Sequence, residues 1–433
     1  MSLINQEYVK LLFQELKTHE YPSNYYFSLQ GERSCFLRVN KSKLRQATHV
    51  DQSNLSVCIK NTEDENLLNV QLTGSLKEDV RRVNAILDEN VEPLEINAEA
   101  ASGDIDDQKI IKHKSRETDF LEILDDGDDL VGIFTDGELF SGVARGGDEK
   151  LQWFETARAD VDYSIYEKDS CIKEFFSLGH LSREKIAEAI IKSKENMSVL
   201  QGEKIELKPG VYPAYFSPSA VNEMLGMFNW HGVQGKAFAE KQSVFMELFE
   251  QKKSFHPAFN LRENFALNLS PKFNEEGEVS EEMIDIIKEG QLVSPLVNST
   301  SAKKYKMNAN KANRSETLRS AELVAGKTSE SELISSMYQG LYISDLHYLN
   351  WSNKKNASIT GMTRYGCYFI DEEGHRMPIK DMRFNMSLYD VFGAWLTEFS
   401  SESKVFSDSH TYGSRSLVGA KVPGVLSSIN FTL

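Results

Sequence analysis

The sequence predicts an α+β protein with a mixed N-terminal region followed by a strand-rich C-terminal domain. In the first part, helical periodicity and β-rich runs follow one another, whereas the second half consists mainly of strands and hairpins with occasional helices. Because helices and strands do not alternate regularly, we do not expect a doubly wound parallel sheet.

Composition limits the classes of function. The chain has 433 residues, 40% of them hydrophobic, which is typical of a globular protein with two or three domains. Its 49 basic and 65 acidic residues give a net charge of −16, which disfavours attraction to nucleic acids or anionic membranes. No run approaches the roughly 20 apolar residues that span a bilayer. The four scattered cysteines show no zinc-binding spacing, and we expect a cytoplasmic protein.

Residues 1–90 are expected to form an N-terminal α+β domain. Residues 5–17 have helical periodicity, and the runs FLRVN and LSVCIK are rich in β-forming residues. Ser75 and Glu78 have the spacing of a capping box before the apolar run VRRVNAIL, which predicts that a helix begins there.

Two further segments follow. Residues 91–129 are polar and acidic without a clear period, so they are interpreted as a linker. Residues 130–207 form a middle region, in which Asp136-Gly137 predicts a hairpin because this pair suits a type I′ turn. Ser182 precedes a run with helical spacing, so it is expected to cap a helix.

Residues 208–433 are expected to form the C-terminal domain, beginning at Lys208-Pro209-Gly210. Glycines predict hairpin turns, and serines predict helix starts, one of them in a capping box. The turns are predicted at Gly290 and Gly374. The capping box is formed by Ser329 and Glu332, and Ser387 is expected to cap a further helix.

The stretch SPSAVNEMLGMFNWHG is predicted to be a buried amphipathic helix. Ser217-Pro218 is a favourable start, because serine caps free amides and proline at the first position loses no hydrogen bond. Gly226 costs about 1 kcal/mol relative to alanine inside a helix, which indicates close packing or a distortion. The apolar stripe comprises Val221, Met224, Leu225 and Phe228.

This stretch resembles the TldD/PmbA family of peptidases, also called modulators of DNA gyrase. Catalytic members carry His-Glu-x-x-x-His here, and the resemblance implies that the histidines bind zinc and the glutamate is the general base. In this sequence the three positions are Asn222, Glu223 and Met227. Asparagine and methionine cannot replace two imidazoles at a zinc hydrolase centre. A family cysteine near the C-terminus corresponds approximately to Ser409.

Other segments extend the resemblance along nearly the whole chain, including FNEEGEVSEEMIDIIKEGQLVSPLVNS and GMTRYGCYFIDEEGHRMPIKDMRFNMSLYDVF. Absence of the metal ligands resembles the TldE (PmbA) side of the family. The resemblance implies a non-catalytic subunit without its own cofactor, which pairs with a zinc-bearing TldD-like homologue, or with itself, and acts on unfolded peptides. Arg364 is then either a structural ion-pair donor or a residue that binds the peptide substrate.

Two alternatives remain open. A self-contained metallopeptidase could use relocated ligands at Glu223, His231 and His410, since positions 223 and 231 stand about 80° apart on an ideal helix. However, the sequence Asn-Trp-His-Gly is expected to end the helix before His231. The second alternative is a homodimeric peptide-binding protein. No phosphate-binding loop, dinucleotide fingerprint or nucleophile-elbow motif is present.

Overall fold

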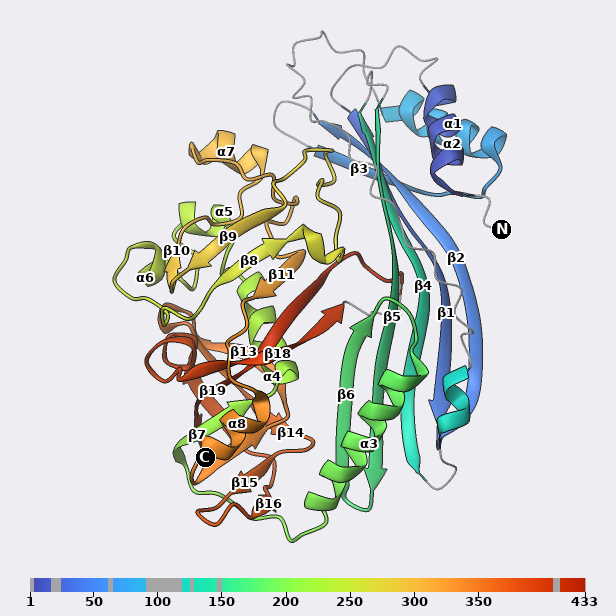
Figure 1. Cartoon of the computed structure of the whole chain (residues 1–433). Coiled ribbons are helices and arrows are strands. Elements are labelled where there is room, and N and C mark those ends of the chain that lie inside the picture. Colours follow the sequence, from blue (N-terminus) through green and yellow to red (C-terminus); the bar gives the residue numbers. More distant parts are fainter. Residues whose placement is uncertain are drawn as a thin grey trace.

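The computed structural model describes residues 4–16, 25–60, 65–90, 119–124, 128–145, 150–407 and 413–432. Two β-sheets with helices at their edges and faces form the framework (Figure 1), so the α+β prediction is confirmed. Within the described residues, no helix is long and apolar enough to cross a membrane.

The first sheet is antiparallel and has six strands in the order β3-β2-β1-β4-β5-β6. It combines strands from both sides of segment 91–129, so residues 1–90 and 130–207 share one sheet. The division into domains stays a prediction, and most of the expected linker lies outside the described residues. The strands are β1 (Tyr25–Asn40), β2 (Lys43–Lys60), β3 (Glu65–Gln71), β4 (Asp129–Arg145), β5 (Leu151–Glu167) and β6 (Ser170–Leu178).

The hairpin predicted at Asp136-Gly137 is wrong. β4 runs without a turn through both residues, and Gly137 pairs with Ser34 of β1 and Arg158 of β5. A Cβ atom at Gly137 would lie 2.1 Å from the carbonyl oxygen of Arg33. The glycine therefore allows close approach of the neighbouring strand, which is the other common role of glycine in a strand.

Three helices accompany the first sheet: α1 (Gln6–Leu16), α2 (Leu76–Asn90) and α3 (Arg183–Val199). The predictions of α1 and of the Ser182 cap on α3 are confirmed. α2 begins directly after Ser75 as predicted, but Glu78 accepts hydrogen bonds from Arg81 and Arg82. The buried carboxylate of Asp79 instead accepts hydrogen bonds from the backbone amides that precede the helix.

The second sheet is larger and mixed. Its main path is β10-β9-β8-β11-β19-β7-β12-β15-β16, with parallel pairs at β11/β19 and β7/β12. The strands are β7 (Gly210–Phe216), β8 (Leu261–Asn264), β9 (Met283–Lys288), β10 (Gln291–Leu292), β11 (Ser320–Leu323), β12 (Gly340–Ile343), β13 (Asp345–Asn353), β14 (Ser358–Arg364), β15 (Tyr368–Ile370), β16 (Arg376–Pro378), β17 (Arg383–Ser387), β18 (Glu398–Ser407) and β19 (Gly419–Phe431).

Most of the turns and helix caps predicted in the C-terminal half are present in the structure. The hairpins at Gly290 and Gly374 are confirmed, and both glycines have positive φ angles. The capping box of Ser329 and Glu332 is present at the start of α8. After Ser387 the chain forms a short π-helical turn. The helices are α4 (Pro218–Gly226), α5 (Gly235–Ala239), α6 (Met246–Phe249), α7 (Ser299–Tyr305) and α8 (Glu330–Ser336), with the π-helical turn at Asp390–Ala394.

The largest hydrophobic core lies against the second sheet and is rich in aromatic side chains. Phe228 of the predicted motif helix is fully buried, and its ring lies 4.7 Å from Phe245 and 6.0 Å from Phe259 between centroids. Burial of one such side chain stabilises the fold by about 1.5–3 kcal/mol. This core therefore holds α4 firmly against the sheet, so that only its opposite face is available for chemistry.

Candidate functional site

α4 begins at the predicted residue and presents two different faces. The Ser217 hydroxyl accepts a hydrogen bond from the amide of Ala220 (3.3 Å), and Pro218 occupies the first helical position. The predicted apolar stripe is buried in the core. The opposite face lines a cavity of about 690 Å³ through Asn222, Glu223, Gly226 and Asn229, which recur at helical spacing.

Gly226 marks the end of the regular helix. The chain continues as a 3₁₀ turn, Met227–Asn229, so the distortion predicted for this glycine is present. Close packing is absent, because a Cβ atom at Gly226 would meet no atom within 4 Å. The missing side chain leaves open space on the cavity face directly beside Asn222.

The two positions expected to correspond to the zinc ligands point in different directions. Asn222 lines the cavity, whereas Met227 is only 4% exposed and belongs to the hydrophobic core. The described residues that line the cavity include no histidine and no cysteine. Among these described lining residues the charged oxygen donors are Asp160, Asp162 and Glu223, and none of them supplies the imidazoles on which the family motif depends.

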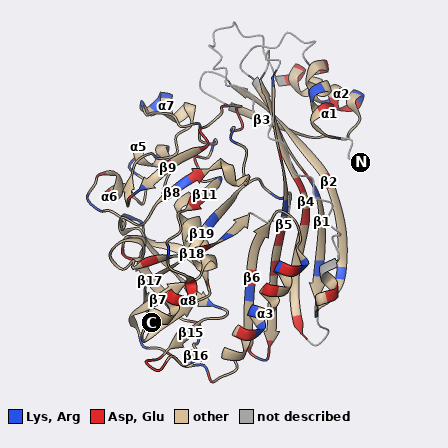
Figure 2. Cartoon of the chain, viewed as in Figure 1, with Lys and Arg blue, Asp and Glu red and all other residues tan. Residues whose placement is uncertain are grey.

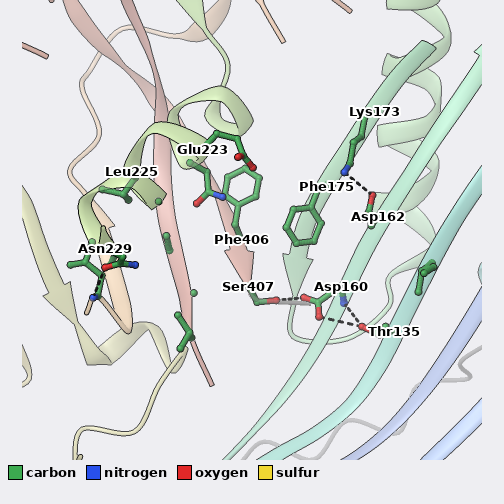
Figure 3. Close-up of a pocket in the computed structure, with 18 residues that line it drawn as sticks. Thr135, Asp160, Asp162, Lys173, Phe175, Glu223, Leu225, Asn229, Phe406 and Ser407 are labelled. Carbon is green, nitrogen blue, oxygen red and sulfur yellow. Dashed lines mark hydrogen bonds and ion pairs between the residues drawn. The ribbon is translucent and has the colours of Figure 1, made fainter. Parts of the chain in front are cut away.

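The first sheet supplies the opposite wall of the cavity. Asp160 and Asp162 are two residues apart, so both side chains lie on the same face of β5. Lys173 and Phe175 share a face of β6 in the same way. Figure 3 shows these side chains facing Glu223 and Phe406 of the second sheet's layer. The rings of Phe175 and Phe406, one from each wall, lie 5.8 Å apart between centroids, so the two walls are in contact at this point.

A buried ion pair joins the walls at the inner end of the cavity. The carboxylate of Asp160 contacts the guanidinium of Arg415 at 3.0 Å, and both side chains are almost fully buried. Asp160 also accepts hydrogen bonds from Ser177 (2.7 Å) and from Ser407 of β18. Burial by itself raises the pKa of Asp160, but the charges of Arg415 and Arg158 hold it below its ordinary value.

A charged cluster occupies the outer part of the cavity. Lys173 lies 3.6 Å from Asp162, and its charge also interacts with Glu223 and Asp345. Burial raises the pKa of Glu223, although Lys173 opposes this shift. Burial and the nearby charge of Glu223 raise the pKa of Asp345 to about 7. Three carboxyl groups thus lie near one ammonium group, and burial raises the pKa of each of them.

Comparison with known proteins accounts for this architecture. Residues 209–428 match the family model described as the PmbA/TldA metallopeptidase C-terminal domain, which covers just over half of the chain. The chain belongs to the PmbA/TldD metallopeptidase family. None of the curated proteins compared matches the chain in sequence.

Solved structures of similar fold extend the match to the N-terminal sheet. A protein described as a modulator of DNA gyrase from Bacteroides thetaiotaomicron VPI-5482 has a TM-score of 0.74 at 14% identity, with 99% of each chain covered. A modulator of a DNA gyrase from Thermotoga maritima MSB8 has a TM-score of 0.71 at 15% identity, covering 99% of this chain and 100% of that one. TldE from Thermococcus kodakarensis gives 0.69 at 14% identity, covering 98% and 99%. At these identities the likeness shows the PmbA/TldD fold alone.

The alternative zinc ligands of this PmbA/TldD family member stay a prediction. His231 follows the 3₁₀ turn and lines a second cavity, whereas Glu223 lines the first. His410 and Ser409 lie outside the described residues.

Arg364 lies on β14, outside the residues that line either of these cavities. Its guanidinium is 3.3 Å from the ring Nδ1 of His347 and lies over the ring of Tyr365 at 5.0 Å. Burial and the positive charges of Arg364 and Lys173 lower the pKa of His347. These contacts give Arg364 local partners, and its binding of a peptide stays a prediction.

Within the described chain, one group of possible metal ligands is close enough to share an ion. It comprises Asp371, Glu373 and His375 in the turn between β15 and β16. The Asp371 carboxylate already accepts hydrogen bonds from the backbone amides of the other two residues. This arrangement is an ordinary side-chain-stabilised turn, remote from the cavity of α4.

The sequence interpretation missed the wall contributed by the first sheet. A signal was available, because ADVDYS places Asp160 and Asp162 on the same face of a strand, and IKEFF does so for Lys173 and Phe175. Charged residues on one face of a predicted strand indicate a polar surface, but their proximity to α4 depends on contacts more than 40 residues apart in sequence.

Proposed function

We propose that the chain is the non-catalytic, TldE-like subunit of a TldD/TldE-type zinc metallopeptidase that degrades or matures unfolded peptides. The observation that carries the proposal is the cavity face of α4, which presents Asn222, Glu223 and Gly226 while Met227 lies in the core. Glu223 without a neighbouring metal has no bound water to activate, so its family role as general base does not operate here.

The catalytic zinc is proposed to lie in a TldD-like partner, and this chain is proposed to contribute walls to the chamber that receives peptides. The assembly is placed in the cytoplasm. No disulfide joins the four cysteines, which lie in described parts of the chain, and this is in keeping with a reducing compartment. Extended peptides are suitable ligands for a cavity between two sheets, because exposed strand edges offer backbone hydrogen bonds with little sequence preference.

Purification from the native organism tests the subunit role. The chain is tagged at its own locus, and co-purifying proteins and bound metals are measured. We expect a His-Glu-x-x-x-His homologue to co-purify, with stoichiometric zinc and peptidase activity in the complex and neither in the isolated chain. As a control, the complex is prepared with the glutamate of the partner's motif replaced by glutamine, which should remove activity and retain assembly.

Two outcomes would contradict the proposal. Stoichiometric zinc in the isolated chain that is lost on His231→Ala would favour the self-contained peptidase. A stable homodimer that binds peptide without any zinc-bearing homologue would favour a peptide-binding protein. The different cavities occupied by Glu223 and His231 argue against the first of these.

A further inference from the structure

A second cavity of about 790 Å³ lies directly beyond the end of the motif helix. It shares Asn229 with the first cavity, and the side-chain oxygen of Asn229 accepts a hydrogen bond from the amide of Leu318 (2.8 Å). Leu318 lines the first cavity, whereas the preceding residue, Thr317, lines the second. The two cavities are therefore adjacent.

Two tryptophans, Trp230 and Trp351, line this second cavity. Trp230 is 54% exposed, and the left-handed turn at His231 (φ 65°) projects it from the end of the helix. The indole of Trp351 donates a hydrogen bond to the carbonyl oxygen of Trp230 (3.2 Å) and meets the ring of Phe245 edge-on. A large aromatic side chain that is exposed beside a cavity is typical of a binding anchor.

The cavity is also rimmed by cations. Lys236, Lys304 and Lys354 line it, and no salt bridge joins these three to a carboxylate in the described part of the chain. Lys304 lies over the ring of Tyr305 and interacts with the charge of Glu240. Residues 300–314 contain five lysines and arginines and no acidic residue, and Figure 2 shows this basic colour on α7.

The carboxylates of the lining have partners of their own. Glu316 is buried and accepts hydrogen bonds from the backbone amides of Lys236 (2.8 Å) and Asn298 (3.1 Å). Glu240 accepts a hydrogen bond from the hydroxyl of Tyr305. Glu276 also lines the cavity, so three glutamates stand beside three lysines and Arg314 in the lining.

We propose that this second cavity is a binding subsite for an acidic segment of a peptide, in which an aromatic or aliphatic side chain contacts Trp230 and flanking carboxylates face Lys304 and Lys354. The inference rests on the proposed function in taking a peptide as the ligand. Charge complementarity selects an acidic segment at Lys304 and Lys354, because neither lysine forms a salt bridge within the described residues of this chain of net charge −16, whereas Glu316 and Glu240 already accept hydrogen bonds. The same net charge repels a long polyanion such as a nucleic acid.

Direct binding to the purified chain tests the inference without any partner or turnover. Fluorescein-labelled peptides of sequence GSEFEGS and GSQFQGS are titrated, and fluorescence anisotropy reports the dissociation constants. We expect the acidic peptide to bind about tenfold more tightly, equivalent to about 1.4 kcal/mol, and the preference to shrink as salt is added. The double variant K304E/K354E should abolish the preference, and W230A should weaken both peptides.

The matched control is K77E/K185E, which makes the same charge change at exposed lysines of α2 and α3. It should leave the preference intact. Equal binding of the two peptides, or equal effects of the two double variants, would overturn the inference. So would tighter binding of an oligothymidylate that depends on Lys304 and Lys354. Because the isolated chain is measured, failure here with a zinc-bearing partner still co-purifying would remove only this subsite and leave the proposed function standing.

Discussion

At the scale of single residues, the direction of each α4 side chain decides what this helix can hold. Asn222 and Gly226 are four residues apart and line one cavity, whereas Met227 is buried in the core. In this chain the position that would complete a pair of metal ligands beside Asn222 is therefore 226 and not 227. The sequence motif alone could not show whether position 226 or position 227 faces the cavity, because motif spacing does not say which face of the helix is buried.

This geometry predicts the result of restoring histidines. Asn222→His combined with Gly226→His should create a divalent-metal site beside Glu223, since a side chain at 226 meets no atom within 4 Å. Asn222→His with Met227→His should bind no metal and should lose about 1–3 kcal/mol of folding free energy, because an imidazole replaces a packed thioether in the core. Zinc titration by calorimetry and urea unfolding distinguish the two, and zinc binding by the second variant would contradict the assignment of faces.

Asp345 predicts a pH dependence of stability. Its pKa rises from 3.8 to about 7, mainly through burial and through the charge of Glu223, while Lys173 and the amide of Leu346 oppose the rise and Asp162 adds to it. The folded protein thus holds the proton more tightly than the unfolded chain. Protonation contributes stability that is fully present below about pH 4 and is lost as pH rises through about 7.

Asp345→Asn should remove this contribution. Urea unfolding from pH 5 to pH 8 should show the unmodified chain losing more stability than the variant, which should be the more stable of the two above pH 7. A parallel pH profile for both proteins would show that another group is responsible. Lys173→Met serves as a control, because removal of the ammonium should raise the pKa of Asp345 further and move the transition to higher pH.

At the scale of elements, β4 shows where local sequence signals stop being sufficient. Asp-Gly is favoured in tight turns, but at Gly137 the deciding fact is the distance to a strand that lies 100 residues earlier in sequence. By contrast, α1, α3, α8 and the hairpins at Gly290 and Gly374 depend on caps and turns within a few residues, and they could be predicted. The same limit explains why Glu223 was found and its partner Lys173 was not.

Replacement by alanine is expected to lower the free energy of unfolding by different amounts at Gly137 and at Gly374. Gly137→Ala should destabilise the protein by about 2–4 kcal/mol, because the new methyl group meets the backbone of β1. Gly374→Ala should cost about 1 kcal/mol, since the turn requires a positive φ of 83° but leaves open space around the Cβ. Urea unfolding of both variants checks this, and equal costs would contradict the close approach of β1 to Gly137.

At the scale of the whole molecule, the candidate site exists only because the two sheets face each other. Its walls come from β4, β5 and β6 on one side and from α4, β11, β18 and β19 on the other (Figure 3). Hydrogen bonds of Arg158 to the backbone of Ser416 and Leu269 reinforce the same contact. The relative position of the sheets therefore sets the dimensions of the cavity, and the contacts that fix this position are buried and polar.

The ion pair of Asp160 and Arg415 is the element of this contact that can be tested most sharply. Either Asp160→Asn or Arg415→Met leaves one buried charge without its partner, which should cost about 3–5 kcal/mol. The double variant removes both charges, so its loss should be much smaller than the sum, giving a large coupling energy in a double-mutant cycle by urea unfolding. The exposed pair of Lys380 and Glu206, at 2.7 Å, is the matched control and should show a coupling of only about 0–1 kcal/mol. Additive losses at the buried pair would mean that other contacts hold the sheets together and that the cavity keeps its shape without this ion pair.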